Sequence, residues 1–182
     1  MTTWITSDLH FGHTNIMKFC PVSRARFNND VNYMNEQMVV EWNNCIGPED
    51  TVYILGDVAF MPASKAAQIL RRLNGTKILI EGNHDRKVLK DQEFRDCFAE
   101  VHKYYTTTYN GHYITMFHYP IAEWDQMHRG ALHFHGHLHG GESGLEHFRA
   151  RDMGMDATNM IAVTMERAIA DAMTGQIKGH HV

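Results

Sequence analysis

Four histidines fall within seven positions of the segment HFHGHLHGG, residues 133–141. Neutral imidazole is the commonest protein ligand for transition metals, so this spacing suggests a metal site. A surface strand that is rich in histidine would produce the same pattern, and so would a closed structural zinc site. A metal site needs ligands from elsewhere in the chain, so the remaining polar clusters must distinguish these three possibilities.

Polar clusters follow the apolar, strand-like runs of this sequence. The clusters are SDLHFGH (7–13), GDVAF (56–60), GNHDR (82–86), FHYP (117–120) and GHLH (136–139), and their possible ligands are Asp8, His10, Asp57, Asn83, His118, His137 and His139. In open α/β sheets the carboxyl ends of the strands form the ligand crevice, so we expect these clusters to converge there. A glycine within four of these five clusters allows the tight turn that aims a side chain at a ligand.

These seven side chains supply oxygen and nitrogen atoms, and none of them is a cysteine. A structural zinc ion would favour four thiolate or imidazole ligands in a closed tetrahedron. Seven mixed ligands instead suit two ions of intermediate hardness, such as manganese, iron or zinc, that share a carboxylate. Two ions about 3.5–4 Å apart form a clamp for in-line displacement at phosphorus.

The series D-x-H … G-D … G-N-H-D … H … G-H-x-H resembles the signature of the calcineurin-like metallophosphoesterase superfamily and runs in the same order from Asp8 to His139. The likeness is closest to small uncharacterised phosphoesterases of bacteria and phages that open with DLHFGH. The resemblance implies an α/β (α+β) fold, a four-layer α/β/β/α sandwich of two mixed β-sheets flanked by helices. It also implies a binuclear metal-dependent phosphoester hydrolase in which a hydroxide between the ions attacks phosphorus in line.

The resemblance further implies a role for each matching residue. The first ion takes Asp8, His10 and His139, the second takes Asn83, His118 and His137, and Asp57 bridges both. His84 matches the position that contacts the scissile phosphate and protonates the leaving oxygen, and Asp85 is expected to orient His84. The implied cofactors are two divalent transition-metal ions, Mn²⁺ first, with iron, zinc and nickel as alternatives.

Several further histidines and a tryptophan leave two interpretations open. His13 either contacts a substrate phosphate or caps the next helix. His133 and His135 alternate with apolar residues as in a strand, which favours a structural or supporting role. Trp124 either stacks on a nucleobase or, as we favour, packs in the core or a lid. His180 and His181 are expected to form a frayed tail.

Three arginines could bind phosphate oxygens, because a guanidinium group matches their geometry. For Arg24, Arg26 and Arg86, ordinary surface placement is equally compatible with the sequence.

The elements that must position these residues follow from apolar periodicity. Strand-like runs occupy 2–6, 51–55, 77–81, 113–117 and 131–135, and the segment 104–117 is predicted to form a hairpin that turns at Asn110-Gly111. Apolar spacing predicts helices over 31–45 and 66–73, and a third over 165–173 that Thr164 caps. Strands and helices alternate without a linker, which predicts one α/β domain over residues 1–182 whose first three strands are parallel.

Composition restricts the setting and the partners. The chain has 182 residues, 43% hydrophobic content and a formal net charge of −4, which argues against binding long duplex nucleic acid. Its three cysteines lack a Cys-x-x-Cys spacing and are predicted to be free thiols in a reducing compartment. Neither a signal peptide nor a membrane-length apolar run is evident, so we expect a cytoplasmic protein with no membrane partner.

The expected substrate is a small phosphodiester, a nucleotide or an RNA end. The residues after Asp57 are VAFMP rather than the D-R-G of Ser/Thr protein phosphatases and symmetrical dinucleoside tetraphosphate hydrolases, which disfavours those two classes. A phosphomonoesterase with the same site is the alternative enzyme. The non-enzymatic alternatives are a metal-binding scaffold module for a protein partner and a metal store.

Overall fold

The computed structural model describes residues 1–179, and His180 and His181 lie outside the described residues. Its strands are β1 (Thr3–Thr6), β2 (Thr51–Ile54), β3 (Thr76–Ile80), β4 (Glu100–His102), β5 (Tyr104–Tyr109), β6 (His112–Phe117), β7 (Leu132–His135), β8 (Ala150–Asp152) and β9 (Val163–Thr164). Its α-helices are α1 (Ile16–Phe19), α2 (Pro21–Arg24), α3 (Val31–Cys45), α4 (Ala63–Leu70), α5 (Asp85–Val88), α6 (Gln92–Arg95) and α7 (Met165–Met173). Two 3₁₀ helices, η1 (Ala25–Phe27) and η2 (Met127–Arg129), complete the structure.

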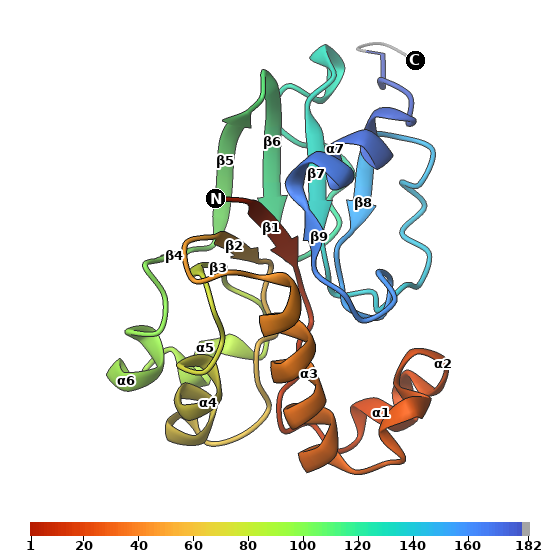
Figure 1. The fold of residues 1–182 in the computed structure, drawn as a ribbon. Helices are drawn as coiled ribbons and strands as arrows, with labels where there is room; N and C mark the ends of the chain where they lie inside the picture. The colour runs from red at the N-terminus through yellow and green to blue at the C-terminus, as the bar shows by residue number, and fades with distance from the viewer. Residues whose placement is uncertain (180–182) are drawn as a thin grey trace.

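Two mixed β-sheets flanked by helices form the framework, which confirms the expected fold class (Figure 1). The first sheet has the order β4-β3-β2-β1-β9, and only β9 runs antiparallel to its neighbour. The second has the order β5-β6-β7-β8, in which β5 and β6 form an antiparallel hairpin and the remaining pairs are parallel. The prediction that the first three strands are parallel is confirmed. Their carboxyl ends therefore lie at one edge, where the polar clusters follow.

Local sequence signals explain the turn and the longest helix. Asn110 and Gly111 both have positive φ, 47° and 81°, as a two-residue type I′ turn between paired strands requires. Helix α3 starts after Asp30, whose carboxylate accepts hydrogen bonds from the backbone N–H groups of Asn32 and Tyr33. Thr164 caps α7 as predicted, because its side chain accepts a hydrogen bond from the N–H of Arg167.

The hydrophobic core has three layers, one between the two sheets and one on the outer face of each sheet. Between the two sheets lie Ile5, Leu55, Ile80, Ile114, Met116, Leu132 and Phe134, together with residues of α7. The opposite face of the five-stranded sheet packs on α3 and α4. The outer face of the four-stranded sheet is covered by Trp124 and Met127, from a loop and from η2. The chain thus buries both faces of each sheet and leaves the strand ends free to carry polar loops.

The strands β4, β8 and β9 and the short helices α1, α2, α5 and α6 were not predicted from the sequence. Each contains at most four residues, too few to establish a periodicity. Within residues 1–179, no helix combines the length and apolarity needed to cross a lipid bilayer.

Candidate metal centre

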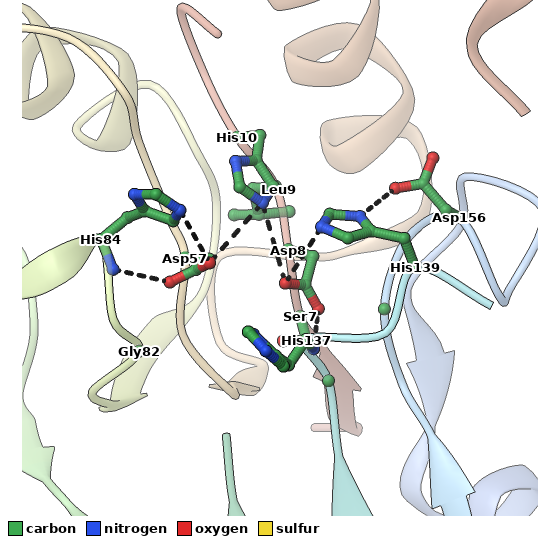
Figure 2. Close-up of polar contacts among 12 residues, drawn as sticks. Ser7, Asp8, Leu9, His10, Asp57, Gly82, His84, His137, His139 and Asp156 are labelled. Atoms are coloured by element: carbon green, nitrogen blue, oxygen red, sulfur yellow. Dashed lines mark hydrogen bonds and ion pairs between the residues drawn. The ribbon is translucent and has the colours of Figure 1, made fainter. Parts of the chain in front are cut away.

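The structure brings all seven possible ligands together at the ends of the strands. Figure 2 shows five of them, Asp8, His10, Asp57, His137 and His139. One atom each from Asp8, His10 and His139 lies within 4.8 Å of the other two. The same limit holds for a second group, Asp57, His118 and His137. Asn83 completes the second group, because its Oδ1 lies 3.0 Å from Nε2 of His118. These are the two sets that the family resemblance implied.

Two polar atoms at this centre are buried and have no hydrogen-bond partner. They are Oδ1 of Asp8 and Nε2 of His10, and they face each other at 3.8 Å. Nε2 of His10 also lies 3.7 Å from Oδ2 of Asp57. These separations are too long for hydrogen bonds, but two ligands of one ion, each about 2.0–2.2 Å from it, can be as much as about 4.4 Å apart. The residues therefore fit a divalent cation between them.

Two facing hydrogen-bond acceptors indicate a cation site in the second ligand group as well. The Nδ1 of His118 lies 2.6 Å from the carbonyl oxygen of Leu55, to which it donates its proton in the neutral ring. Nε2 of His118 is then an acceptor, yet it faces Oδ1 of Asn83, which is also an acceptor. It also lies 3.6 Å from Oδ1 of Asp57. A bound cation would satisfy these lone pairs together.

The backbone is strained at most of these positions. Asp8, His10, Asp57, His137 and His139 all have positive φ, between 51° and 74°. Non-glycine residues rarely adopt this left-handed conformation, and such outliers concentrate at functional sites. The strain is therefore a second, independent indication that these five side chains are aimed at a ligand.

Glycines permit the close approach of the ligand loops. A Cβ atom at Gly136 would lie 2.4 Å from Oδ2 of Asp8, and one at Gly82 would lie 2.3 Å from Oδ1 of Asp57. Neither position can hold a larger residue without moving a carboxylate of the centre. At these two positions glycine is needed for the close approach of a carboxylate, rather than for the tight turn that we expected from the sequence.

His84 lies at the open side of the centre, with about a third of its side chain exposed. Its backbone N–H donates to Oδ1 of Asp57, and its ring Nε2 lies 3.8 Å from Oδ2 of the same residue. It belongs to neither ligand group. The ring is thus close to the space between the groups and free to meet a substrate.

His13 does not cap a helix through its side chain. Its ring nitrogen Nδ1 lies 3.1 Å from Nδ1 of His10, and its ring stacks on Phe60 with the centroids 4.4 Å apart. Burial, with the neighbouring rings of His10 and His84, lowers the pKa of His13 to about 4. A neutral His13 can accept the Nδ1 proton of His10, which leaves Nε2 of His10 free to bind a cation.

The structure corrects the role expected for Asp85. Its fully buried carboxylate accepts hydrogen bonds from the backbone N–H groups of Asp57, Val58 and Gly82 at 2.8–3.0 Å, and so it does not orient the His84 ring as expected. Burial raises the pKa of Asp85 to about 6 although these hydrogen bonds oppose it. Asp85 ties together the loops that follow β2 and β3.

The three arginines that we considered as phosphate ligands divide into two cases. Arg24 is fully buried, so both the phosphate contact and the surface placement were wrong for it. Arg26 forms an exposed ion pair with Glu41, and Arg86 is largely exposed near Glu81. The latter two agree with the surface interpretation.

The structural interpretation holds for the residues around β7. Trp124 is buried, donates its indole N–H to the carbonyl oxygen of Ala131 and lies against the ring of His133. His133 and His135 are both buried on the outer face of the four-stranded sheet. All three therefore contribute to packing beside the centre.

Asp156 is the residue that sequence reasoning missed. Its Oδ2 lies 2.8 Å from Nδ1 of His139, and Arg24 donates to both of its carboxylate oxygens (Figure 2 shows the His139 contact). We found the other candidates because they follow predicted strands. Asp156 follows β8, which is too short to be predicted from the sequence.

The ionisation of the histidines is set by burial and by carboxylates. Burial lowers the pKa of His10 and of His137, which favours the neutral form that binds metals. Burial would also lower the pKa of His139, but the interactions with Asp156, Cys20 and Asp8 together outweigh it and raise this pKa to about 10. A cation at His139 would therefore displace a proton.

A groove of about 610 Å³ opens beside His139. It lies between the helices α1 and α2 on one side and the loops after β7 and β8 on the other. Its lining includes Phe19, Val22, Leu138, His139 and Asn159. Phe19 and Val22 are well exposed at this groove. A second, more apolar cavity of about 280 Å³ lies beside α3 and contains none of the seven ligands.

Comparison with known proteins identifies this arrangement. The family model described as calcineurin-like phosphoesterase matches residues 1–138, which is most of the chain. This chain belongs to the calcineurin-like phosphoesterase family. An uncharacterized protein of Methanocaldococcus jannaschii, MJ1445, is 35% identical over 138 residues, which cover 75% of this chain and 68% of that protein.

Two further proteins are similar to this chain in sequence or in structure. The Gene 66 protein of Mycobacterium phage L5 is 35% identical over 86 residues, which cover 46% of this chain and 39% of that protein. The crystal structure of AQ665, a protein of unknown function from Aquifex aeolicus, matches with a TM-score of 0.72 and 25% identity over 93% of this chain and 97% of that one. As a calcineurin-like phosphoesterase, the chain is a metal-dependent phosphoesterase.

Proposed function

We propose that this calcineurin-like phosphoesterase is a phosphodiesterase that uses two divalent ions, Mn²⁺ first, to hydrolyse a small phosphodiester, a nucleotide or an RNA end. The observation that carries the proposal is the pair of adjoining ligand groups with unpartnered buried atoms. The mixture of carboxylate, amide and imidazole ligands suits ions of intermediate hardness. The three free cysteines support a reducing, cytoplasmic location.

In the mechanism that we propose, each ligand group holds one ion. Asp8, His10 and His139 hold the first, Asn83, His118 and His137 hold the second, and Asp57 lies between the groups with one oxygen towards each. When bound, the two ions would supply the charge that activates a water and neutralises the phosphate. The chain's part is to hold these imidazole, amide and carboxylate groups in place around the two sites.

His84 would complete the reaction from the open side of the centre. Its backbone hydrogen bond to Asp57 fixes its position, and its partly exposed ring is free to contact the phosphate. We propose that it donates a proton to the leaving oxygen. His13 and Phe60 border the same side, since the ring centroids of His84 and Phe60 are 5.1 Å apart.

The preference for a diester is supported by the groove beside His139. A diester carries two organic substituents, and the groove offers space for one of them next to the first ligand group. The net charge of −4 opposes a long duplex as the partner and leaves small phosphoesters as the proposed substrates.

The test compares bis-p-nitrophenyl phosphate with p-nitrophenyl phosphate as substrates of the protein reconstituted with Mn²⁺, Ni²⁺ or Zn²⁺. We expect the higher kcat/KM for the diester and loss of activity on chelation. A higher value for the monoester would replace the proposal with a phosphomonoesterase. Tight binding of ions without turnover of either substrate would favour a scaffold or a metal store.

A further inference from the structure

We infer that Arg24 and Asp156 are positioning residues that build the first ion site by linking the two loops from which its ligands come. The inference rests on the proposed two-ion function. It concerns residues that belong to neither proposed ligand set.

Arg24 contacts the first of these loops through its guanidinium group. Nη2 donates to the carbonyl oxygen of Asp8 at 2.9 Å, and Nη1 donates to that of Leu9 at 3.3 Å. Asp8 and His10, the residues on either side of Leu9, both have positive φ. An arginine has five donors in a planar fork, and here they hold a strained turn in place.

The same guanidinium group binds the second loop through Asp156. Nε donates to Oδ1 of Asp156 at 2.9 Å, and Nη2 donates to Oδ2 at 3.0 Å. Both side chains are almost fully buried, with 0% of Arg24 and 1% of Asp156 exposed. A buried charge pair of this kind is stable only with good geometry and further hydrogen bonds, which both partners have.

Asp156 in turn orients His139, the third ligand of the first ion. Its Oδ2 accepts the Nδ1 proton of His139, so in the neutral ring Nε2 of His139 is the acceptor that faces Oδ1 of Asp8, 4.0 Å away. A carboxylate behind a metal-binding histidine fixes the tautomer and the ring orientation. The three ligands that belong to the first ion alone therefore depend on one buried ion pair, whereas the second group contacts neither partner.

Cys20 also approaches His139 and Asp156, within the distance that a third ion would need. Both oxygens of Asp156 already accept from Arg24, and Oδ1 accepts from Ser23 as well. A cation there would lie beside the buried guanidinium charge. The geometry therefore favours a positioning role for this cluster over a third metal site.

The test is a calorimetric titration of the metal-free protein with Mn²⁺. Wild type should bind two ions, and Asp156→Asn should weaken one of them about 10–100-fold, the usual effect of removing such a partner. The titration should resemble that of His10→Ala and differ from that of Asn83→Ala. Turnover of Asp156→Asn should recover when Mn²⁺ is raised to saturation, as for a residue that acts through the ion.

Matched variants keep the result interpretable. Ser23→Ala removes a hydrogen bond to the same carboxylate on the side away from His139, and it should leave both affinities unchanged. Because Asp156→Asn leaves a buried arginine unpaired, the double variant Arg24→Met/Asp156→Asn, which removes both charges, is titrated as well. It should fold by circular dichroism and show the same selective loss.

Three outcomes would overturn the inference. They are unchanged affinity for both ions in Asp156→Asn and in the double variant, equal weakening of both ions, and a third bound ion that Cys20→Ser removes. Failure of the wild type to bind two ions would instead refute the proposed function, which distinguishes the two failures.

Discussion

The backbone N–H of Asp57 donates a 2.9 Å hydrogen bond to the carboxylate of Asp85, so the proposed bridging residue is held in place by the loop that follows the next strand. The same carboxylate accepts from Val58 and Gly82. Asp85 thus supports the second ligand group in the way that Arg24 supports the first. The Asp85 carboxylate accepts hydrogen bonds from backbone N–H groups, whereas the Arg24 guanidinium group donates to backbone carbonyl oxygens.

Replacing Asp85 should damage stability and the second ion together. In Asp85→Asn the amide group faces N–H donors, so at least one buried N–H loses its acceptor at a cost of about 1–3 kcal/mol. We expect a lower denaturation midpoint and weaker binding of the second ion. The control is Asp91→Ala, because Asp91 also accepts a backbone N–H, that of Phe94 in α6, which is not bonded to a ligand loop. It should reduce stability and leave ion binding intact. Unchanged ion binding in Asp85→Asn would refute this role.

Replacing Asp57 should affect both ions. Its two oxygens face different groups, at 3.7 Å from His10 and 3.6 Å from His118, so Asp57→Asn removes a charge that both ions share. Calorimetric titration should show weaker binding at both sites. Full affinity at either site would show that Asp57 is not the bridge.

His84 and Asn83 are neighbours with different expected roles. His84→Ala should retain both ions while turnover falls by roughly 10²–10⁴-fold, the usual contribution of a general acid. Asn83→Ala should weaken the second ion, with activity partly restored by excess Mn²⁺. Ion content measured by elemental analysis separates the two, and loss of an ion from His84→Ala would contradict the assignment.

The leaving group provides a further test of His84. An alkoxide leaving group needs a proton, whereas p-nitrophenolate needs little protonation. The loss in His84→Ala should therefore be severe for alkyl esters and mild for p-nitrophenyl esters. An equal loss for both would restrict His84 to positioning the phosphate.

His133 should make the fold sensitive to acid. Burial, assisted by the charge of His135, lowers its pKa from 6.5 to about 3, so between these values the unfolded state binds a proton that the folded state does not. The free energy of unfolding is therefore unaffected by this pKa shift above pH 6.5. Below that pH it decreases, by about 2 kcal/mol at pH 5. Denaturant unfolding with a chelator present should show a shallower pH dependence for His133→Gln than for wild type. The exposed His147, changed to Gln, should leave the slope unchanged. An unaltered slope in His133→Gln would count against this account.

The ligand residues could be predicted because they follow apolar strands directly and belong to a recognisable series. The sequence places Asp8 after β1, Asp57 after β2 and Asn83 after β3, and parallel pairing then brings them to one edge. Alternation within β7 likewise indicated that His133 and His135 are structural. The hairpin was predictable because Asn110-Gly111 is a local signal.

The supporting residues could not be predicted, because their contacts depend on tertiary structure. Arg24 and Asp156 are 132 positions apart, and nothing near either residue marks the other. Arginine is almost never buried without a partner. Because the sequence does not show which residue is the partner of Arg24, it does not reveal that Arg24 is buried. The same holds for Asp85, whose three partners are backbone groups that any sequence supplies.

The left-handed backbone at five of the ligands restricts how this protein can evolve. A left-handed conformation costs roughly 1–2 kcal/mol for an ordinary residue and little for glycine. Five such positions therefore reduce stability by an amount comparable to the total of about 5–15 kcal/mol that a domain has. A lineage that no longer needed hydrolysis could gain stability by acquiring glycine at these positions. Persistence of aspartate and histidine there in a descendant would be a sign of continued selection for the chemistry, independent of any assay.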